Sequence, residues 1–189
     1  MTEWLRRISV GAAFGLIGLS AQADPIVTGV EGGFEFGVVD AEGITWSGAD
    51  AAADSLGDGW TLASITSQDE FDLIVSLLPS APANRTHYWI GGTDFADEGT
   101  WVWIDGESFG PYEAWWGGEP NNSGDEDYLA MDFRSDSPSG WGWNDAPDGV
   151  SSIVPVGGFV VKRSVPEPGT LALLGLGLVG VGVARRRKA

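Results

Sequence analysis

Hydrophobic and polar positions alternate from Gly32 to Val39, and this period of two predicts a first β-strand with one buried face. Behind Thr45 the apolar residues recur at helical spacing, so we expect a helix that begins there and ends at a glycine-rich turn. A second helix is expected behind Ser67, because Ser67 and Glu70 have the spacing of a capping box. This helix should stop at Pro79, which cannot continue it.

Beyond the second helix, the pattern changes to short extended stretches separated by glycine, proline, asparagine and aspartate. Extended segments are expected at Leu62–Ile65, Tyr88–Gly91, Thr100–Ile104, Leu129–Phe133 and Gly158–Lys162, and around Trp141 and Trp143. A strand, two helices and then short strands indicate an α+β fold with small antiparallel sheets, because a parallel sheet would need strands and helices to alternate. The long loop from Asp105 to Asp127 is of the kind that is usually functional in a compact domain.

Residues 1–23 have the order of a secretory signal. Two arginines precede an apolar run from Ile8 to Leu19, and Ala21-Gln22-Ala23 follows as a small-residue cleavage motif. We therefore expect export with cleavage after Ala23. A buried helix is the alternative interpretation.

Residues 165–189 also differ from the rest of the chain. An apolar run from Leu171 to Ala184 ends in a basic cluster, Arg185 to Lys188. The run is shorter than the roughly 20 residues that cross a bilayer comfortably, and its basic end would stay in the cytoplasm. The segment predicts a short transmembrane tail that anchors the chain transiently in a membrane.

The remaining residues, 24–164, have the size of one domain. Of the 10 basic residues in the chain, only Arg85, Arg134, Lys162 and Arg163 lie in this range, together with 25 of the 27 acidic ones, so its charge is about −21. Such a surface repels nucleic acid and anionic lipid and attracts cations. The chain has no cysteine, so we expect tryptophan packing and bound cations to supply the stability that disulfides give other exported domains.

The segment WWGGEPNNSGDEDY, from Trp115 to Tyr128, carries four carboxylates and two asparagines without a basic residue. Three interpretations are open: a solvated loop, a carboxylate pair for glycoside hydrolysis, and a cage for a divalent cation. Mixed carboxylate and amide oxygens favour calcium, and a chain with one histidine, His87, and no cysteine is a poor candidate for zinc. Hydrolysis would need one carboxylic acid to stay protonated, which a polar loop does not favour, so we expect no enzyme activity.

The C-terminal segment resembles a known sorting signal. Val165-Pro166-Glu167-Pro168, the short apolar run and the arginine cluster are similar to the PEP-CTERM signal of Gram-negative bacteria. That resemblance implies an inner-membrane-anchored precursor that an exosortase recognises and cuts. The protein would then reach the cell surface or an extracellular exopolysaccharide matrix.

The domain itself resembles the C-type lectin-like family over nearly all of residues 24–164. The similarity depends on many short motifs in one order rather than on any single motif. The matching segments are Thr45-Trp46, Leu62-Ala63-Ser64-Ile65, Tyr88-Trp89-Ile90-Gly91-Gly92, Glu98-Gly99-Thr100-Trp101-Val102-Trp103, Asp105-Gly106, Trp116, Glu119-Pro120-Asn121, Glu126-Asp127 and Trp143-Asn144-Asp145. The resemblance implies a C-type lectin-like fold with two helices, small antiparallel sheets and a long calcium-binding loop region.

In that family, a Glu-Pro-Asn triplet with a cis proline and a downstream Trp-Asn-Asp build a calcium site that also binds the sugar. The resemblance therefore implies one set of residues for both Ca²⁺ and sugar: Glu119, Asn121, Glu126, Asn144 and Asp145. It implies a second calcium site at Asp94, Glu98, Asn122 and Asp127, which Glu126 would share. Glu-Pro-Asn goes with sugars of the mannose type, which have equatorial 3- and 4-hydroxyls, whereas galactose-binding members tend to carry Gln-Pro-Asp.

The family usually has two disulfides, and this chain has none. The resemblance places the missing cysteines in the helical half between Ala53 and Asp72, at Tyr128, near Asp148 and near Val160. Loss of two disulfides forgoes roughly 2–4 kcal/mol each, so we expect stability to depend on calcium. The predicted function is calcium-dependent binding of mannose-type sugars by an exported bacterial protein, in cell-surface or exopolysaccharide adhesion. The alternative is a structural or protein-binding matrix component that keeps the fold and binds no sugar.

Overall fold

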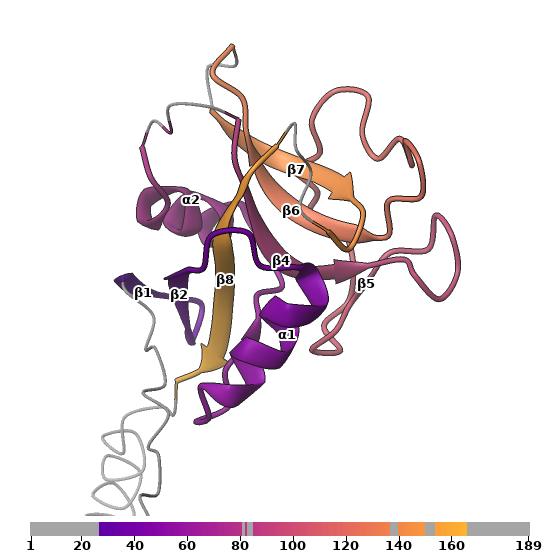
Figure 1. The fold of residues 1–189 in the computed structure, drawn as a ribbon. Coiled ribbons are helices and arrows are strands. Elements are labelled where there is room, and N and C mark those ends of the chain that lie inside the picture. The colour runs from indigo at the N-terminus through magenta and orange to yellow at the C-terminus, as the bar shows by residue number, and fades with distance from the viewer. Residues whose placement is uncertain (1–26, 81, 83–84, 137–139, 150–153, 166–189) are drawn as a thin grey trace, which may run out of the picture.

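The structure is a computed structural model, and it describes residues 27–80, 82, 85–136, 140–149 and 154–165 (Figure 1). The expected secretory signal, residues 1–23, lies outside the described residues, and so does all but the first residue of the expected tail. Within the described ranges, no helix is long and apolar enough to cross a membrane.

Two helices and eight strands make up the described part of the chain. The helices are α1 (Trp46–Ser55) and α2 (Gln68–Leu77). The strands are β1 (Val27–Glu31), β2 (Phe34–Asp40), β3 (Thr61–Leu62), β4 (His87–Thr93), β5 (Val102–Trp103), β6 (Tyr128–Phe133), β7 (Trp141–Ala146) and β8 (Val156–Ser164). Each helix and strand expected from the sequence is present to within a few residues, and β1 is an additional strand that pairs with β2.

The eight strands belong to one sheet, in the order β1-β2-β8-β4-β6-β7, with β3 added to β8 and β5 added to β4. Pairing is antiparallel except between β4 and β8, which run parallel. The sequence predicted small antiparallel sheets, and the structure joins them into one. The reason is β8, the last strand, which enters between β2 and β4 and so links the two halves of the chain (Figure 1).

Both helices begin at the expected side-chain caps. Thr45 Oγ1 accepts a hydrogen bond from Gly48 N (3.0 Å), and Ser67 Oγ accepts one from Glu70 N (3.2 Å). These bonds satisfy N–H groups that have no partner inside the helix. Only half of the expected capping box forms, because the Glu70 carboxylate accepts instead from Thr66 N, over 2.6 Å.

Tryptophan side chains fix α1 to the sheet. The helix packs against β3, β4 and β8, whereas α2 packs against β1 and β2. Trp46 Nε1 donates to Ile90 O, and Trp89 Nε1 donates to Ile44 O, each over 2.8 Å. Tyr128, where the family resemblance places a cysteine, packs its ring against Trp46 with centroids 4.7 Å apart. An aromatic contact therefore stands at Tyr128, where the family resemblance places a disulfide.

A second aromatic cluster lies under the long loop between β5 and β6. Trp143, in β7, is fully buried, and the rings of Trp103, Tyr112 and Trp115 lie 5.5, 5.8 and 5.7 Å from its ring between centroids. Trp116 N donates to Trp143 O over 2.9 Å. These contacts hold the start of the acidic loop, residues 115–127, against β7 and so position the candidate site.

Candidate metal centre

The acidic loop meets strand β7. Asp145, in β7, accepts hydrogen bonds at Oδ2 from the backbone N of Asn121 (2.9 Å) and of Asn122 (2.7 Å). The Glu119–Pro120 peptide bond that precedes them is cis, as the family resemblance implied. Two segments that carry predicted ligands are thus in direct contact, although Asn121 and Asp145 are 24 residues apart in the chain.

One oxygen of Asp145 has no hydrogen-bond partner among the described residues. Asp145 is 1% exposed, and its Oδ1 is buried. A buried carboxylate oxygen is costly unless it is hydrogen-bonded or coordinates a cation. This orphaned oxygen supports a cation beside Asp145.

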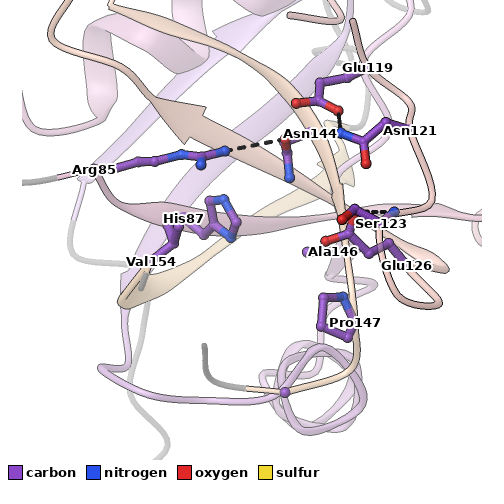
Figure 2. A pocket seen from close by; sticks show the side chains of 11 residues that line it. Arg85, His87, Glu119, Asn121, Ser123, Glu126, Asn144, Ala146, Pro147 and Val154 are labelled. Atoms are coloured by element: carbon purple, nitrogen blue, oxygen red, sulfur yellow. Dashed lines mark hydrogen bonds between the residues drawn. The ribbon is translucent and has the colours of Figure 1, made fainter. Parts of the chain in front are cut away.

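A cavity of about 410 Å³ opens next to Asn144 (Figure 2). Four of the five residues predicted for the first calcium site line it: Glu119, Asn121, Glu126 and Asn144. Asn121 Nδ2 donates to Glu119 Oε2, as the dashed line between them in Figure 2 marks. We call these four residues and Asp145 the principal site, because the structure brings all five to one place.

The carboxylates of the principal site repel one another, which makes the ionised form of each less favourable. Burial raises the pKa of Asp145, and the nearby Glu119 carboxylate raises it further, although backbone N–H groups oppose the shift. Burial raises the pKa of Glu126 as well, with smaller contributions in the same direction from Asp145 and Glu119. A divalent cation would relieve this repulsion, so the electrostatics of the principal site favour one.

A second group of carboxylates lies between the end of β4 and the start of β6. Asp94, Glu98 and Asp127 each offer an oxygen within 4.8 Å of the others. Asp94 is 3% exposed; its Oδ2 accepts from Gly99 N over 2.9 Å, whereas its Oδ1 is buried without a partner among the described residues. Three of the four residues predicted for the second calcium site therefore come together, and we call these three the second site.

The fourth predicted residue, Asn122, belongs to the neighbouring loop. Its Oδ1 accepts from Glu126 N over 2.8 Å, which uses one of the two lone pairs of this amide oxygen. Within the second site, desolvation followed by repulsion from neighbouring carboxylates, Asp94 among them, raises the pKa of both Glu98 and Asp127. Three crowded carboxylates with an orphaned oxygen fit a hard cation such as calcium.

A network of ion pairs around the buried Asp132 adjoins the principal site and was not predicted from the sequence; two of its members, Arg85 and His87, line the same cavity. Asp132, in β6, is fully buried, and three basic side chains approach it: Arg85 Nη2 at 2.6 Å, Arg134 Nε at 2.7 Å and His87 Nε2 at 3.3 Å. Burial raises the pKa of Asp132, but the adjacent His87 side chain and the hydrogen bonds from Arg85 and Arg134 outweigh burial and lower the pKa to about 2. Asp132 is therefore an anchor for positive charge.

Arg134 connects this network to two predicted calcium ligands. Its Nη2 lies 2.8 Å from Glu119 Oε1 and 2.9 Å from Asn144 Oδ1. Arg85 Nη2 lies 3.3 Å from the same Asn144 oxygen (Figure 2). The sequence signal that could have pointed to this network is the rarity of basic residues, because two of the four in residues 24–164 meet here.

Known protein families match two parts of the chain. The model of the lectin C-type domain matches residues 42–153, a range that includes every residue of the principal and second sites. This chain belongs to the C-type lectin family. The PEP-CTERM protein-sorting motif matches residues 164–188 of the lectin, in agreement with the predicted tail. That motif indicates a secreted protein that an exosortase processes.

Solved C-type lectin domains share the fold. The C-type lectin CEL-I from Cucumaria echinata has a TM-score of 0.60 and 25% identity, over 76% of this lectin and 99% of CEL-I. The C-type lectin domain of murine dendritic cell inhibitory receptor 2, solved in complex with an N-glycan, has a TM-score of 0.58 and 26% identity, over 75% of this lectin and 99% of that domain. The predicted α+β, C-type lectin-like fold is thereby confirmed.

Sequence relatives match parts of the lectin domain. C-type lectin domain family 4 member M of Nomascus concolor is 47% identical over 72 residues, which are 36% of this lectin and 16% of the relative. Perlucin-like protein of Mytilus galloprovincialis is 33% identical over 108 residues, which are 55% of this lectin and 63% of the relative. This lectin thus spans less than two thirds of either relative. The family and these relatives support carbohydrate binding.

Proposed function

We propose that this lectin binds sugars of the mannose type through calcium. The proposal assigns a Ca²⁺ ion and the sugar to the principal site, Glu119, Asn121, Glu126, Asn144 and Asp145. The observation that supports it most is the meeting of carboxylate and amide oxygens from the loop and from β7 at one cavity, beside a buried Asp145 oxygen without a partner. Calcium takes roughly six to eight oxygens of these kinds.

The chemistry of the principal site suits two neighbouring hydroxyls of a sugar ring. Calcium, when bound, would supply open coordination positions for the hydroxyl oxygens and the counter-charge that the acidic loop lacks. Glu119 and Glu126 accept hydrogen bonds from the hydroxyls, and the amides of Asn121 and Asn144 donate to them. The Glu-Pro-Asn sequence supports equatorial 3- and 4-hydroxyls, as in mannose.

We assign a further Ca²⁺ to the second site, with Asp94, Glu98 and Asp127 as ligands. Asn122 is the fourth proposed ligand, through the lone pair of its side-chain oxygen that does not accept from Glu126 N. The second site lies at the base of the acidic loop, because Asp94 N donates to Asp127 O over 3.1 Å. A cation there would hold the end of the loop next to β4.

The proposed biological role is adhesion at the cell surface or in an exopolysaccharide matrix of a Gram-negative bacterium. Residues 1–23 would be removed on export, residues 24–164 would be the binding domain, and residues 165–189 would hold the precursor in the inner membrane until an exosortase cuts the tail. A single shallow sugar site binds weakly, so retention in a matrix requires several sites at once. The role is one of binding and not of catalysis.

Retention on mannose-agarose tests the proposal. We expect the lectin to bind the resin in calcium and to elute in EDTA. A glycan array should then compare the natural chain with Glu119→Gln/Asn121→Asp, and we expect this double variant to shift its preference toward galactose. Asp136→Asn, an exposed carboxylate outside both sites, is the matched control and should keep the mannose preference. Retention that persists in EDTA would contradict the role of calcium.

One observation favours a second function, that of a structural or protein-binding matrix component that binds no sugar. Arg134 already brings positive charge to Glu119 and Asn144, so the principal site is held together without a metal ion. No glycan on the array would retain a protein of this kind, with or without calcium.

A further inference from the structure

Arg134 and the proposed calcium ion require the same oxygen atoms. Glu119 Oε1 accepts from Arg134 Nη2 over 2.8 Å, and Glu119 Oε2 accepts from Asn121 Nδ2. Asn144 Oδ1 accepts from Arg134 Nη2 over 2.9 Å and from Arg85 Nη2 over 3.3 Å. An amide oxygen has two lone pairs, so these N–H groups occupy the positions that a cation would need.

We infer that Arg134 sets the calcium affinity of the principal site, as an internal counter-cation that Ca²⁺ must displace. The inference rests on the proposed function, because it takes Glu119 and Asn144 as calcium ligands. Without calcium, the guanidinium holds the two side chains together across the loop and β7. Calcium binding breaks both Nη2 hydrogen bonds, so the affinity is lower than the same oxygens would give with no arginine present.

The other contacts of Arg134 allow this displacement without unfolding. Its Nε donates to Asp132 Oδ2 over 2.7 Å, and its guanidinium carbon lies 5.4 Å from the centre of the Trp116 ring. Neither contact involves a proposed calcium ligand, so calcium competes for neither of them. The Arg134 side chain is 24% exposed, which gives the released end access to water. Arg85 and His87 also remain on Asp132, so its buried charge stays paired.

The second site offers an internal reference, because its carboxylates are not held in this way. Among the described residues, no ion pair involves Asp94, Glu98 or Asp127. Calcium must therefore displace a guanidinium at the principal site and no basic side chain at the second site.

Calcium titration of the full chain by isothermal calorimetry tests the inference. Asp94→Asn serves as the background, because it weakens the second site and leaves the principal site to be observed. In that background, we expect Arg134→Gln to bind calcium about tenfold more tightly, since two hydrogen bonds from a charged group no longer have to break. Circular dichroism checks that each variant is folded.

Two further variants separate hydrogen bonding from charge. Arg134→Lys keeps the positive charge but cannot reach Asp132, Glu119 and Asn144 at once, so it should also tighten calcium binding. Arg163→Gln is the matched control, because it removes an arginine–carboxylate pair on β8 and should leave the calcium affinity unchanged. In addition, a crystal structure of the natural chain with calcium should show Arg134 Nη2 beyond hydrogen-bond distance of Glu119 Oε1.

The outcomes distinguish this inference from the proposed function. Equal calcium affinity with and without Arg134 would overturn the inference alone. Tightening by Arg134→Gln but not by Arg134→Lys would support it and assign the effect to the positive charge. Calcium binding that appears only after substitution of Arg134 would support the competition and overturn the proposed function of the natural chain. Absence of calcium from the principal site in every variant would overturn both.

Discussion

At the principal site the chain supplies its own cation, whereas at the second site carboxylates face one another without a basic partner among the described residues. Arg134 forms an ion pair with Glu119 at the principal site. At the second site, Asp94, Glu98 and Asp127 each offer an oxygen within 4.8 Å of the others. Each site still has one buried carboxylate oxygen, from Asp145 and from Asp94, that no described residue contacts by a hydrogen bond. Clustered oxygens define where a cation fits. How tightly the cation binds depends on the hydrogen bonds and ion pairs that those oxygens must give up.

The largest expected effect concerns the anchor of the principal site. Asp132→Asn removes the charge that Arg85, Arg134 and His87 share in a fully buried position. We expect the free energy of unfolding to fall by about 3 kcal/mol, because breaking a buried ion network leaves charges uncompensated. Urea unfolding in EDTA measures the change. Asp136→Asn, an exposed carboxylate, is the control, and an equal loss in both variants would contradict the anchoring role of Asp132.

Calcium should stabilise the lectin at both sites. At a free calcium concentration of about 100 times Kd, each filled site adds about 2.7 kcal/mol to the free energy of unfolding. We expect Asp145→Asn to abolish the contribution of the principal site and Asp127→Asn that of the second site. Thermal melting with calcium and with EDTA measures both contributions. A melting temperature that EDTA leaves unchanged would show that neither site is filled.

The pH dependence should separate Asp132 from the crowded carboxylates. The folded pKa of Asp132 is about 2, below its ordinary value of 3.8, so its contribution of about 2 kcal/mol is complete above 3.8 and is lost as the pH falls toward 2. For Asp145, Glu126 and Asp127 the folded pKa is raised, so without calcium these groups reduce stability at neutral pH and cease to do so once protonated.

We therefore expect the stability of the calcium-free lectin to rise as the pH is lowered from neutrality to the range just above an ordinary carboxylate pKa. Below that range it should fall again as Asp132 takes up a proton. Calcium should move the stability maximum toward neutral pH, because it binds the ionised carboxylates. Urea unfolding between pH 2 and pH 8, with EDTA and with calcium, measures both curves. Identical curves would contradict carboxylate coordination.

The smallest expected effect on stability is that of removing an ion pair between β2 and β8, which carry no residue of either site. Arg163, in β8, pairs with Glu35, in β2, over 2.7 Å, and both side chains are partly exposed. We expect Arg163→Gln to lower the free energy of unfolding by less than about 1 kcal/mol, equally in calcium and in EDTA. A loss that depended on calcium would indicate that the two ends of the sheet are coupled.

The helices show how far local sequence carries a prediction. Thr45 and Ser67 begin α1 and α2 as expected, because each cap contacts an N–H three residues away. Glu70 differs, since its carboxylate turns to Thr66 and not to Ser67 N. The β8 strand shows the limit, because no local pattern states that the last strand pairs with both β2 and β4.

The candidate sites likewise combine features that local motifs predicted with contacts that they did not. The five residues of the principal site were predicted from family motifs and come together in the structure, although their role as ligands stays a prediction. The place of Asn122 in the second site stays a prediction, and its oxygen accepts the N–H of Glu126 within the same loop. Arg134 follows β6 without any motif around it, so its place beside Glu119 had no local signal beyond the rarity of basic residues in an acidic domain.

The sequence by itself determined the helices, most of the strands, the family, the acidic character and the candidate ligands, because these depend on periodicity, capping residues and short motifs. Only the tertiary structure decided what those ligands touch. Antiparallel pairing of β4 with β6 places His87 opposite Asp132, and Arg85 reaches the same carboxylate from 47 residues away in the chain. Strand register and packing set such contacts, and neither can be read from the neighbours of a residue in sequence.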